Sequence, residues 1–308
     1  MLGSDAVGRF ARVSEGRMEW DGGWTWYRVD GDLGANGPAP LVILHGGPGA
    51  AHDYLEPVAE LASSAGRPCV LYDQIGCGRS EHLPDAPVEF WTVELFCREL
   101  RSLLEHLAIE RRYHVVGQSW GGMLGMEHAV GQPSGLLSLV LANSPASMEL
   151  WVSEANRLRS LLPDEVQATL ARHEAAGTTD SQQYEQAVMQ FYERHLCRIP
   201  FPDGLQRTFA QLAADPTVYH TMNGPSEFHV IGTLKGWNIT PRLGEVRVPV
   251  LVVSGEYDEA TPAVVRPLVE ALPDARWELI EGASHSTHLE EPERFLELVE
   301  AFLTSHDG

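Results

Sequence analysis

The chain has 308 residues, 44% of them hydrophobic, which is enough for one large core with an inserted subdomain. Its formal net charge of −21 at pH 7 would repel phosphate backbones and anionic lipid, so nucleic acid and membranes are poor partners. None of the four cysteines belongs to a Cys-x-x-Cys pair, and their spacings fit no zinc site. Residues 1–12 lack the apolar stretch of a secretory signal, and no stretch approaches the length of a membrane span. We therefore expect a cytoplasmic protein with reduced thiols. The sequence does not determine the oligomeric state, and we favour a monomer.

The pattern of apolar runs predicts an α/β fold with a mostly parallel sheet. Residues 18–30 alternate aromatic and polar side chains around a central Asp-Gly-Gly, which indicates an antiparallel hairpin. Continuous apolar runs, typical of strands buried on both faces, occur at residues 41–44, 69–72, 113–116, 137–142, 250–254 and 277–280. Apolar residues at helical spacing occur at 88–109, 263–272 and 293–303.

The middle of the chain interrupts this alternation. Residues 147–239 contain no clear buried strand, are polar and helix-prone, and are broken by several prolines. We expect a helical cap at 147–240, inserted between the two parts of an α/β core at 1–146 and 241–308. At the carboxyl end of the sheet, where open α/β sheets bind ligands, such a cap would exclude water and shape the substrate pocket.

The pentapeptide Gly-Gln-Ser-Trp-Gly at 117–121 has the pattern Gly-x-Ser-x-Gly. The apolar run at 113–116 precedes it, and a helix-like stretch at 122–130 comes after it. This setting is typical of a nucleophile elbow, a sharp strand-to-helix turn that exposes one serine hydroxyl. We therefore predict that Ser119 is the nucleophile of a hydrolase.

A serine nucleophile needs a base, and the base needs an orienting carboxylate. Asp258 comes after the predicted strand 250–254, and His285 comes after the predicted strand 277–280. Because the carboxyl ends of parallel strands meet at one edge of the sheet, we expect both side chains near Ser119. The order serine, acid, histidine along the chain is also the order in α/β-hydrolases.

Three other residues compete for these roles. Asp73 also lies just past a strand, but it precedes the serine in the chain and stands before two glycines, as a turn residue would. Glu256 is an alternative to Asp258 as the acid, and His288 is an alternative to His285 as the base. We favour Asp258 and His285.

An oxyanion hole needs two backbone N–H donors, one from the residue after the serine and one from the loop after an early strand. Trp120 would supply the first donor. The segment His-Gly-Gly-Pro-Gly at 45–49 directly succeeds the predicted strand 41–44, and its glycines let amides approach a substrate without a Cβ in the way. We predict Gly47 as the second donor.

These motifs together resemble the proline iminopeptidase family of serine peptidases, on the α/β-hydrolase fold. The resemblance covers most of the chain and rests on HGGPG at 45–49, DQIGCGRS at 73–80, GQSWGG at 117–122, GEYDEATP at 255–262 and GASH at 282–285. HGGPG combined with GQSWGG is far more specific than Gly-x-Ser-x-Gly alone. The resemblance implies a triad of Ser119, Asp258 and His285.

The cap segment 219–228, YHTMNGPSEF, is similar to the branch of that family that contains the tricorn-interacting aminopeptidase and the L-amino-acid amidases. That branch removes N-terminal residues, proline included, from short peptides or amino-acid amides. The resemblance implies that carboxylates hold the free α-amino group of the substrate, and Glu227 and Glu256 match those positions, with Tyr219 as a helper. A carboxylate pair suits this task because it binds a cationic amine through charge-assisted hydrogen bonds.

The pocket for the first side chain of the substrate is less defined. Met148, Leu150 and Trp151 are apolar candidates for lining it, and they fit the core of the cap equally well. The preference for proline over leucine or alanine therefore stays open.

We expect acyl transfer through an acyl-enzyme on a small peptide or amino-acid amide with a free N-terminus, with no metal or organic cofactor. Two alternatives remain. One is an esterase or lactonase on the same scaffold, with the glutamates structural. The other is a catalytically silent ligand receptor. Epoxide hydrolases and haloalkane dehalogenases are disfavoured because they carry an aspartate where Ser119 stands.

Overall fold

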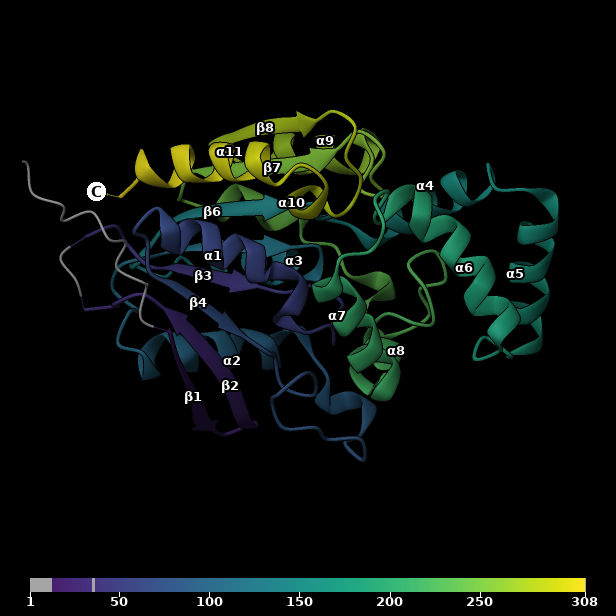
Figure 1. The fold of residues 1–308 in the computed structure, drawn as a ribbon, viewed down its shortest axis with the longest axis horizontal. Helices are drawn as coiled ribbons and strands as arrows, with labels where there is room; N and C mark the ends of the chain where they lie inside the picture. The colour runs from purple at the N-terminus through teal and green to yellow at the C-terminus, as the bar shows by residue number, and fades with distance from the viewer. Residues whose placement is uncertain (1–12, 35–36, 308) are drawn as a thin grey trace, which may run out of the picture.

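The computed structural model describes residues 13–34 and 37–307. The segment 1–12, for which the sequence predicts no secretory signal, lies outside the described residues. Eight strands form one sheet in the order β1-β2-β4-β3-β5-β6-β7-β8 (Figure 1). The strands are β1 (Val13–Trp20), β2 (Gly23–Asp30), β3 (Leu41–Leu44), β4 (Cys69–Tyr72), β5 (Tyr113–Gln118), β6 (Leu136–Ala142), β7 (Val250–Gly255) and β8 (Ala275–Ile280).

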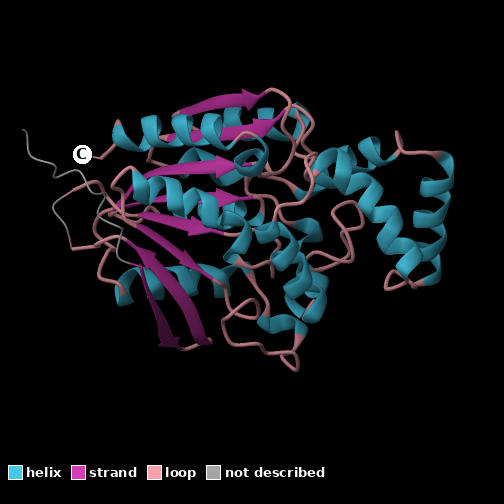
Figure 2. Cartoon of the chain, viewed as in Figure 1, coloured by secondary structure: helices cyan, strands magenta, loops and turns pink. Residues whose placement is uncertain are grey.

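The pairing of the strands confirms the predicted α/β-hydrolase sheet. β1 and β2 form the expected antiparallel hairpin, and β2 also pairs antiparallel with β4. All other neighbours from β4 to β8 pair in parallel. The arrowheads of these parallel strands point toward the large helical group at one end of the molecule (Figure 2). The loops after these strands therefore meet at that end.

Helices cover both faces of the sheet. The core helices are α1 (Glu56–Ser64), α2 (Val93–His106), α3 (Trp120–Val130), α9 (Pro262–Ala271), α10 (Thr287–Glu290) and α11 (Pro292–Thr304), with short 3-10 helices η1 (His52–Leu55) and η2 (Val88–Phe90). Two further 3-10 helices, η3 (Thr233–Gly236) and η4 (Thr240–Glu245), lie between β6 and β7. The helix expected at 88–109 is divided into η2 and α2. The division lies at Thr92, whose hydroxyl accepts a hydrogen bond from the Leu95 amide and so caps α2.

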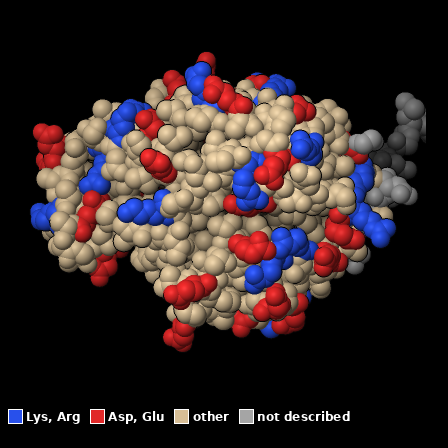
Figure 3. Space-filling model, turned by 180° about the vertical axis from the view of Figure 1, so that it is seen from behind, with Lys and Arg blue, Asp and Glu red and all other residues tan. Residues whose placement is uncertain are grey.

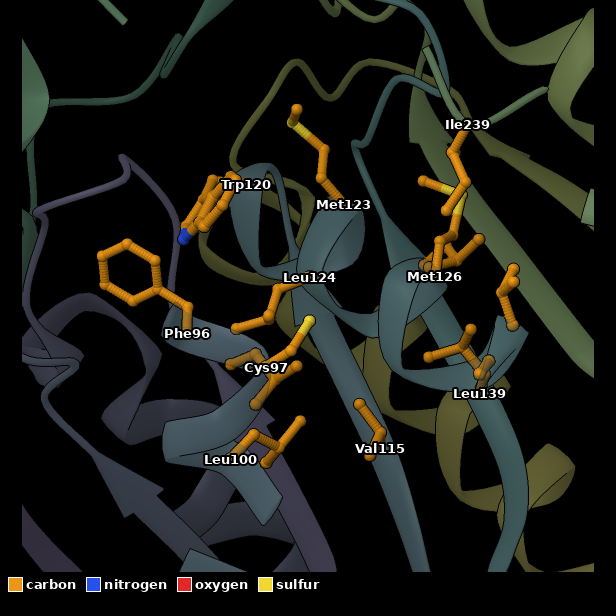
Figure 4. Close-up of a cluster of buried hydrophobic side chains, with 14 of the residues drawn as sticks. Phe96, Cys97, Leu100, Val115, Trp120, Met123, Leu124, Met126, Leu139 and Ile239 are labelled. Carbon is orange, nitrogen blue, oxygen red and sulfur yellow. The ribbon is translucent and has the colours of Figure 1, made fainter. Parts of the chain in front are cut away.

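Successive strand residues belong to two separate apolar clusters, one on each face of the sheet. In β3, Val42 and Leu44 pack with α2, α3 and α9, whereas Leu41 and Ile43 pack with α1 and α11. Figure 4 shows part of the first cluster, in which side chains from α2 and α3 meet those from β5 and β6. Side chains alternate between the two faces of the sheet, and both faces are covered by apolar clusters. Nearly all residues of such a strand are therefore apolar, which explains the continuous apolar runs in the sequence.

The segment between β6 and β7 is helical. It contains α4 (Met148–Arg159), α5 (Asp164–Ala176), α6 (Gln182–His195), α7 (Asp203–Ala214) and α8 (Thr217–Met222), and no strand occurs in residues 143–249, all of which the structure describes. Three of its prolines, Pro163, Pro202 and Pro216, stand immediately before helices, where the missing N–H costs nothing. Helices α4, α5 and α6 share a small apolar cluster of their own and project away from the sheet (Figure 1).

The two ends of this helical insertion are joined to each other. The Ile239 amide donates to the Ala146 carbonyl at 2.9 Å, and the Met148 amide donates to the Trp237 carbonyl at 3.0 Å. The strands that flank the insertion, β6 and β7, are neighbours in the sheet. The chain therefore leaves the core and returns to it at one point.

Surface charge, helix length and the state of the cysteines indicate which kinds of partner or ligand the protein could bind. On the face shown in Figure 3, acidic and basic side chains are interspersed rather than gathered in one basic patch. In the described part of the chain, no helix has both the length and the apolar character needed to cross a membrane. The four cysteines are buried and free, and the residues described contain no cluster of His, Cys, Asp or Glu suited to a metal ion.

Candidate active site

Ser119 lies on a strained turn between β5 and α3. Its backbone has φ 55° and ψ −121°, a region that residues other than glycine rarely adopt. A Cβ at Gly117 would lie 2.2 Å from the Gly121 carbonyl oxygen, and a Cβ at Gly121 would lie 2.1 Å from the Leu44 carbonyl oxygen. Both flanking glycines are therefore required by close backbone packing, as a nucleophile elbow demands.

The structure brings Asp258 and His285 together after β7 and β8. His285 Nδ1 lies 2.8 Å from Asp258 Oδ1, and a carboxylate can only accept, so Nδ1 carries the proton. Asn143 Nδ2, after β6, donates to Asp258 Oδ2 at 2.6 Å, and the Ala260 amide donates to Oδ1 at 2.8 Å. The carboxylate is thus fixed, and it leaves His285 Nε2 as the basic nitrogen.

Asp73 and His288, the alternatives to Asp258 and His285, make hydrogen bonds outside the site. Asp73 accepts from the backbone amides of His52 and Arg79, both at 2.8 Å, as a turn residue does. His288 is buried, its Nε2 lies 3.1 Å from the Tyr54 carbonyl oxygen, and burial lowers the pKa of His288 to about 3. Neither residue lines the cavity that contains Ser119.

The loop after β3 presents Gly47 beside the serine. The Gly46 amide donates to Tyr54 Oη at 2.7 Å, whereas the Gly47 amide makes no backbone hydrogen bond to another described residue. Gly47 has φ +111°, which L side chains rarely adopt, and a Cβ there would lie 2.6 Å from the Ala50 amide nitrogen. Trp120 is the first residue of α3, so its amide has no acceptor within that helix.

One cavity of about 710 Å³ unites most of the predicted site residues. Ser119, His285 and Gly47 line it from the core, and Tyr219 and Glu227 line it from the cap. Tyr219 Oη donates to Glu227 Oε1 at 2.6 Å. Burial raises the pKa of Glu227, although the Tyr219 hydroxyl and the nearby His285 oppose this effect.

Glu256 requires a correction, because the structure does not bring it into this cavity. Its side chain is exposed, and Oε2 accepts from the Gly282 amide at 3.0 Å, so it links the loop after β7 to the loop between β8 and His285. The sequence reasoning missed Glu259, three residues later. Glu259 is fully buried, its Oε1 lies 3.8 Å from His285 Nε2, and neither carboxylate oxygen has a hydrogen-bond partner among the described residues.

The unpaired Glu259 is electrostatically unusual. Burial, and after it the neighbouring carboxylates of Glu227 and Asp258, raise the pKa of Glu259 well above its usual value. Buried carboxylates in proteins are normally paired, so this arrangement is suited to a cation from outside the chain. The signal in the sequence was the dense run of acids in GEYDEATP, in which Glu259 is the neighbour of Asp258.

The three apolar candidates for the substrate pocket do not line the cavity. Met148 and Trp151 are buried, whereas Leu150 is exposed. Trp151 is nevertheless close to the site, because its ring centre lies 5.5 Å from that of His285 and its Nε1 donates to the Glu227 carbonyl at 2.9 Å. It therefore helps to hold the cap against the base.

Comparison with known proteins identifies the family of this chain. The model of the alpha/beta hydrolase fold family matches residues 39–292. The proline iminopeptidase of Lactobacillus helveticus is 36% identical over 298 residues, which cover 96% of this chain and 99% of that protein.

Two solved structures are similar over nearly their whole length. VinJ has 52% identity and a TM-score of 0.93, covering 95% of this chain and 99% of its own. The proline iminopeptidase of Mycobacterium smegmatis has 51% identity and a TM-score of 0.87, covering 96% of this chain and 99% of its own. The chain thus belongs to the proline iminopeptidase family of the α/β-hydrolase fold.

Proposed function

We propose that this protein is a serine aminopeptidase that releases an N-terminal residue, proline or another small apolar residue, from short peptides or amino-acid amides. The observation that carries the proposal is the position of two glutamates beside the base of a Ser119–His285–Asp258 set. Glu227 lines the cavity, whereas Glu259 does not line it but is buried with Oε1 3.8 Å from His285 Nε2. The triad supplies acyl-transfer chemistry. The glutamates supply a reason why the reaction would be restricted to a free amino terminus.

In the acylation step, His285 Nε2 removes the proton from the Ser119 hydroxyl, and the serine oxygen attacks the carbonyl carbon of the first residue. Asp258 keeps the imidazole in the required tautomer through the 2.8 Å contact at Nδ1. The imidazolium then donates its proton to the leaving amine, and the amide bond breaks. Water, activated by the same nitrogen, hydrolyses the acyl-enzyme and regenerates the serine.

The negative charge that develops on the carbonyl oxygen needs donors that are already in place. The Gly47 and Trp120 amides are our candidates because they flank Ser119 and lack internal acceptors in their own segments. Removing one such donor typically costs about 2.7–4 kcal/mol of transition-state stabilisation. Gly46 is not a candidate, since its amide is already bonded to Tyr54 Oη.

The α-ammonium group of the substrate would sit between Glu227 and Glu259. An incoming cation favours the ionised form of both acids, so it would oppose the raised pKa values in the free enzyme. Tyr219, which donates to Glu227 Oε1, would orient that carboxylate. In this proposal Glu259 takes the place of Glu256 in the amine anchor.

The test compares free and N-acetylated versions of the same prolyl arylamide. We expect N-acetylation to abolish cleavage, because the neutral amide cannot satisfy two buried carboxylates. Glu259→Gln and Glu227→Gln should each lower kcat/KM for the free amine by on the order of 100-fold. Glu256→Gln is the matched control from the same loop and should leave kcat/KM unchanged. Equal rates on blocked and free substrates would overturn the anchor.

Ser119→Ala tests the chemistry independently of the anchor. We expect its kcat to fall by on the order of 10⁶-fold, as in other triads. A simple aryl ester provides the comparison with an esterase, which would cleave the ester in preference to the free-amine arylamide. A fluorophosphonate probe that labels the wild type and not Ser119→Ala would exclude a silent receptor.

A further inference from the structure

The cavity is much larger than the first residue of a substrate requires. Beyond the triad and Glu227, it continues between α6 and α7 and is walled there mainly by apolar side chains, Val188, Met189, Tyr192, Leu196, Phe201, Leu205, Phe209 and Leu212. If the amino terminus is held at Glu227 and Glu259 and the carbonyl lies at Ser119, the leaving group must occupy this part. The wall therefore selects the chemical group on the far side of the scissile bond.

Among the residues that the structure describes, no lysine or arginine lines this cavity. The two histidines that line it are the base, His285, and His220, and burial lowers the pKa of His220, which disfavours a positive charge on that ring. Arg207 on α7 does not line the cavity; its guanidinium bonds Asp53 and Glu56, each at 2.7 Å.

The charged side chains on the cap side of the cavity are acidic. Asp180 and Glu185, at the start of α6, line the cavity and are exposed. The carboxylate of a released dipeptide or tripeptide would have to sit among apolar walls and near these acids. Both the loss of solvation and the like charges oppose such a position.

On these grounds, and resting on the proposed function, we propose that the preferred substrates carry a bulky, apolar and uncharged group after the scissile bond. They are aminoacyl amides of long apolar amines, or peptides whose charged C-terminus lies beyond the cavity, rather than free dipeptides. The bond chemistry is unchanged. The C–N bond is hydrolysed, the leaving nitrogen takes the proton from His285, and water supplies the oxygen of the released acid.

The test uses the wild-type protein and prolyl substrates that differ only after the scissile bond. Pro-Leu with a free carboxylate is compared with Pro-Leu-amide, and prolyl butylamide with prolyl hexylamide and prolyl octylamide. We expect Pro-Leu-amide to exceed Pro-Leu at least tenfold in kcat/KM. Within the alkylamide series, kcat/KM should rise up to about fourfold per added methylene while the chain still contacts the apolar wall.

A positive charge introduced into the apolar wall of the cavity tests whether that wall causes the preference for uncharged leaving groups. Leu212→Lys, on α7, should raise kcat/KM for free Pro-Leu and lower it for the octylamide. Leu161→Lys, at an exposed leucine outside the cavity, is the control and should change neither value. Equal cleavage of Pro-Leu and Pro-Leu-amide by the wild type, or no gain along the alkylamide series, would overturn the inference.

Different results would reject the amine anchor of the proposed function and the preference for an apolar leaving group. If N-acetylprolyl octylamide is cleaved as fast as prolyl octylamide, the amine anchor fails. If only free-amine substrates are cleaved but Pro-Leu is as good as its amide, the anchor stands and the apolar leaving group is rejected.

Discussion

The indole N–H of Trp120 donates to Gln74 Oε1 at 2.8 Å. The same glutamine donates from Nε2 to the His45 carbonyl at 3.0 Å, and its backbone amide donates to His45 Nε2 at 2.9 Å. Gln74 is fully buried and lies just after β4. Gln74 therefore connects the loop that contains Gly47 to Trp120, the residue after Ser119, and these are the two segments that we propose as the oxyanion hole.

Gln74→Met should misplace both donors while keeping the volume of the side chain. We expect kcat to fall between about tenfold and 100-fold, less than the loss of a donor itself, with little change in KM. Steady-state kinetics on a prolyl arylamide measures kcat and KM separately. Gln186→Met, at an exposed position of α6, is the control. A change in KM alone would show that Gln74 supports binding rather than the transition state.

Asp258→Asn should leave the fold intact and impair the chemistry. An asparagine amide can donate to His285 Nδ1, which favours the tautomer with the proton on the wrong nitrogen, and kcat drops by about 10⁴-fold in comparable triads. Asp274→Asn, at an exposed residue before β8, should have no effect. Circular dichroism and kcat on the same samples check the prediction, and a drop under tenfold would argue against Asp258 as the orienting acid.

The close backbone packing around Gly121 predicts that an alanine there destabilises the protein, whereas an alanine at Gly236 does not. Gly121→Ala would place a methyl group 2.1 Å from the Leu44 carbonyl oxygen, a backbone atom that cannot move without shifting β3. We expect a loss of at least about 2 kcal/mol in the free energy of unfolding, together with loss of activity. A Cβ at Gly236 meets nothing within 4 Å, so Gly236→Ala should be neutral. Urea unfolding of the two variants measures the difference.

The C-terminal helix is held by a buried arginine, and this contact depends on pH. Arg67, which is 2% exposed, bonds Glu300 and Asp307. Burial opposes ionisation of Asp307, but hydrogen bonds from Arg67 and the Ala39 amide prevail and lower its pKa to about 2. A carboxyl with a depressed pKa in the folded state stabilises the protein above its unfolded pKa, about 3.9, and loses that contribution as pH falls toward 2.

We therefore expect the wild type to be more stable than Asp307→Asn at pH 5–7, with the difference shrinking between about pH 4 and pH 2. Chemical unfolding across this range is the measurement. Asp203→Asn, at an exposed residue of α7, is the control variant for the same substitution. A difference that stays constant down to pH 2 would mean that Asp307 contributes as a hydrogen-bond acceptor and not as a charge.

The sequence was sufficient for the sheet and for the residues at its carboxyl edge. Buried parallel strands are nearly all apolar, so the runs from 41–44 to 250–254 mark such strands within a few residues. The run 277–280 also marks a strand, but β8 lies at the edge of the sheet and is only partly buried, with Leu279 44% exposed. Once the strand ends are known, the residues just after them must share an edge. Ser119, Asp258 and His285 could be named for that reason from the amino-acid order alone.

The contacts that could not be predicted from the sequence depend on the three-dimensional path of loops and cap helices. Glu256 and Glu259 lie in one turn, and only the path of that turn decides that one faces solvent and the other lies behind His285. No role could be predicted for Gln74, because a bond to an indole 46 residues away leaves no local pattern in the sequence. Likewise, no period in the cap helices indicates which of their faces would surround the leaving group.

The joined ends of the insertion between β6 and β7 have a wider consequence. Since Ala146 and Ile239 are already bonded, the insertion leaves and rejoins the core between two neighbouring strands, and its length does not disturb their pairing. Its inner residues are less free to change, because Tyr219 and Glu227 belong to the proposed amine anchor and the His195 carbonyl accepts from the His285 amide. New specificities can therefore arise from substitutions in the α6 and α7 wall of the cavity, while the strands and the loops after them stay the same.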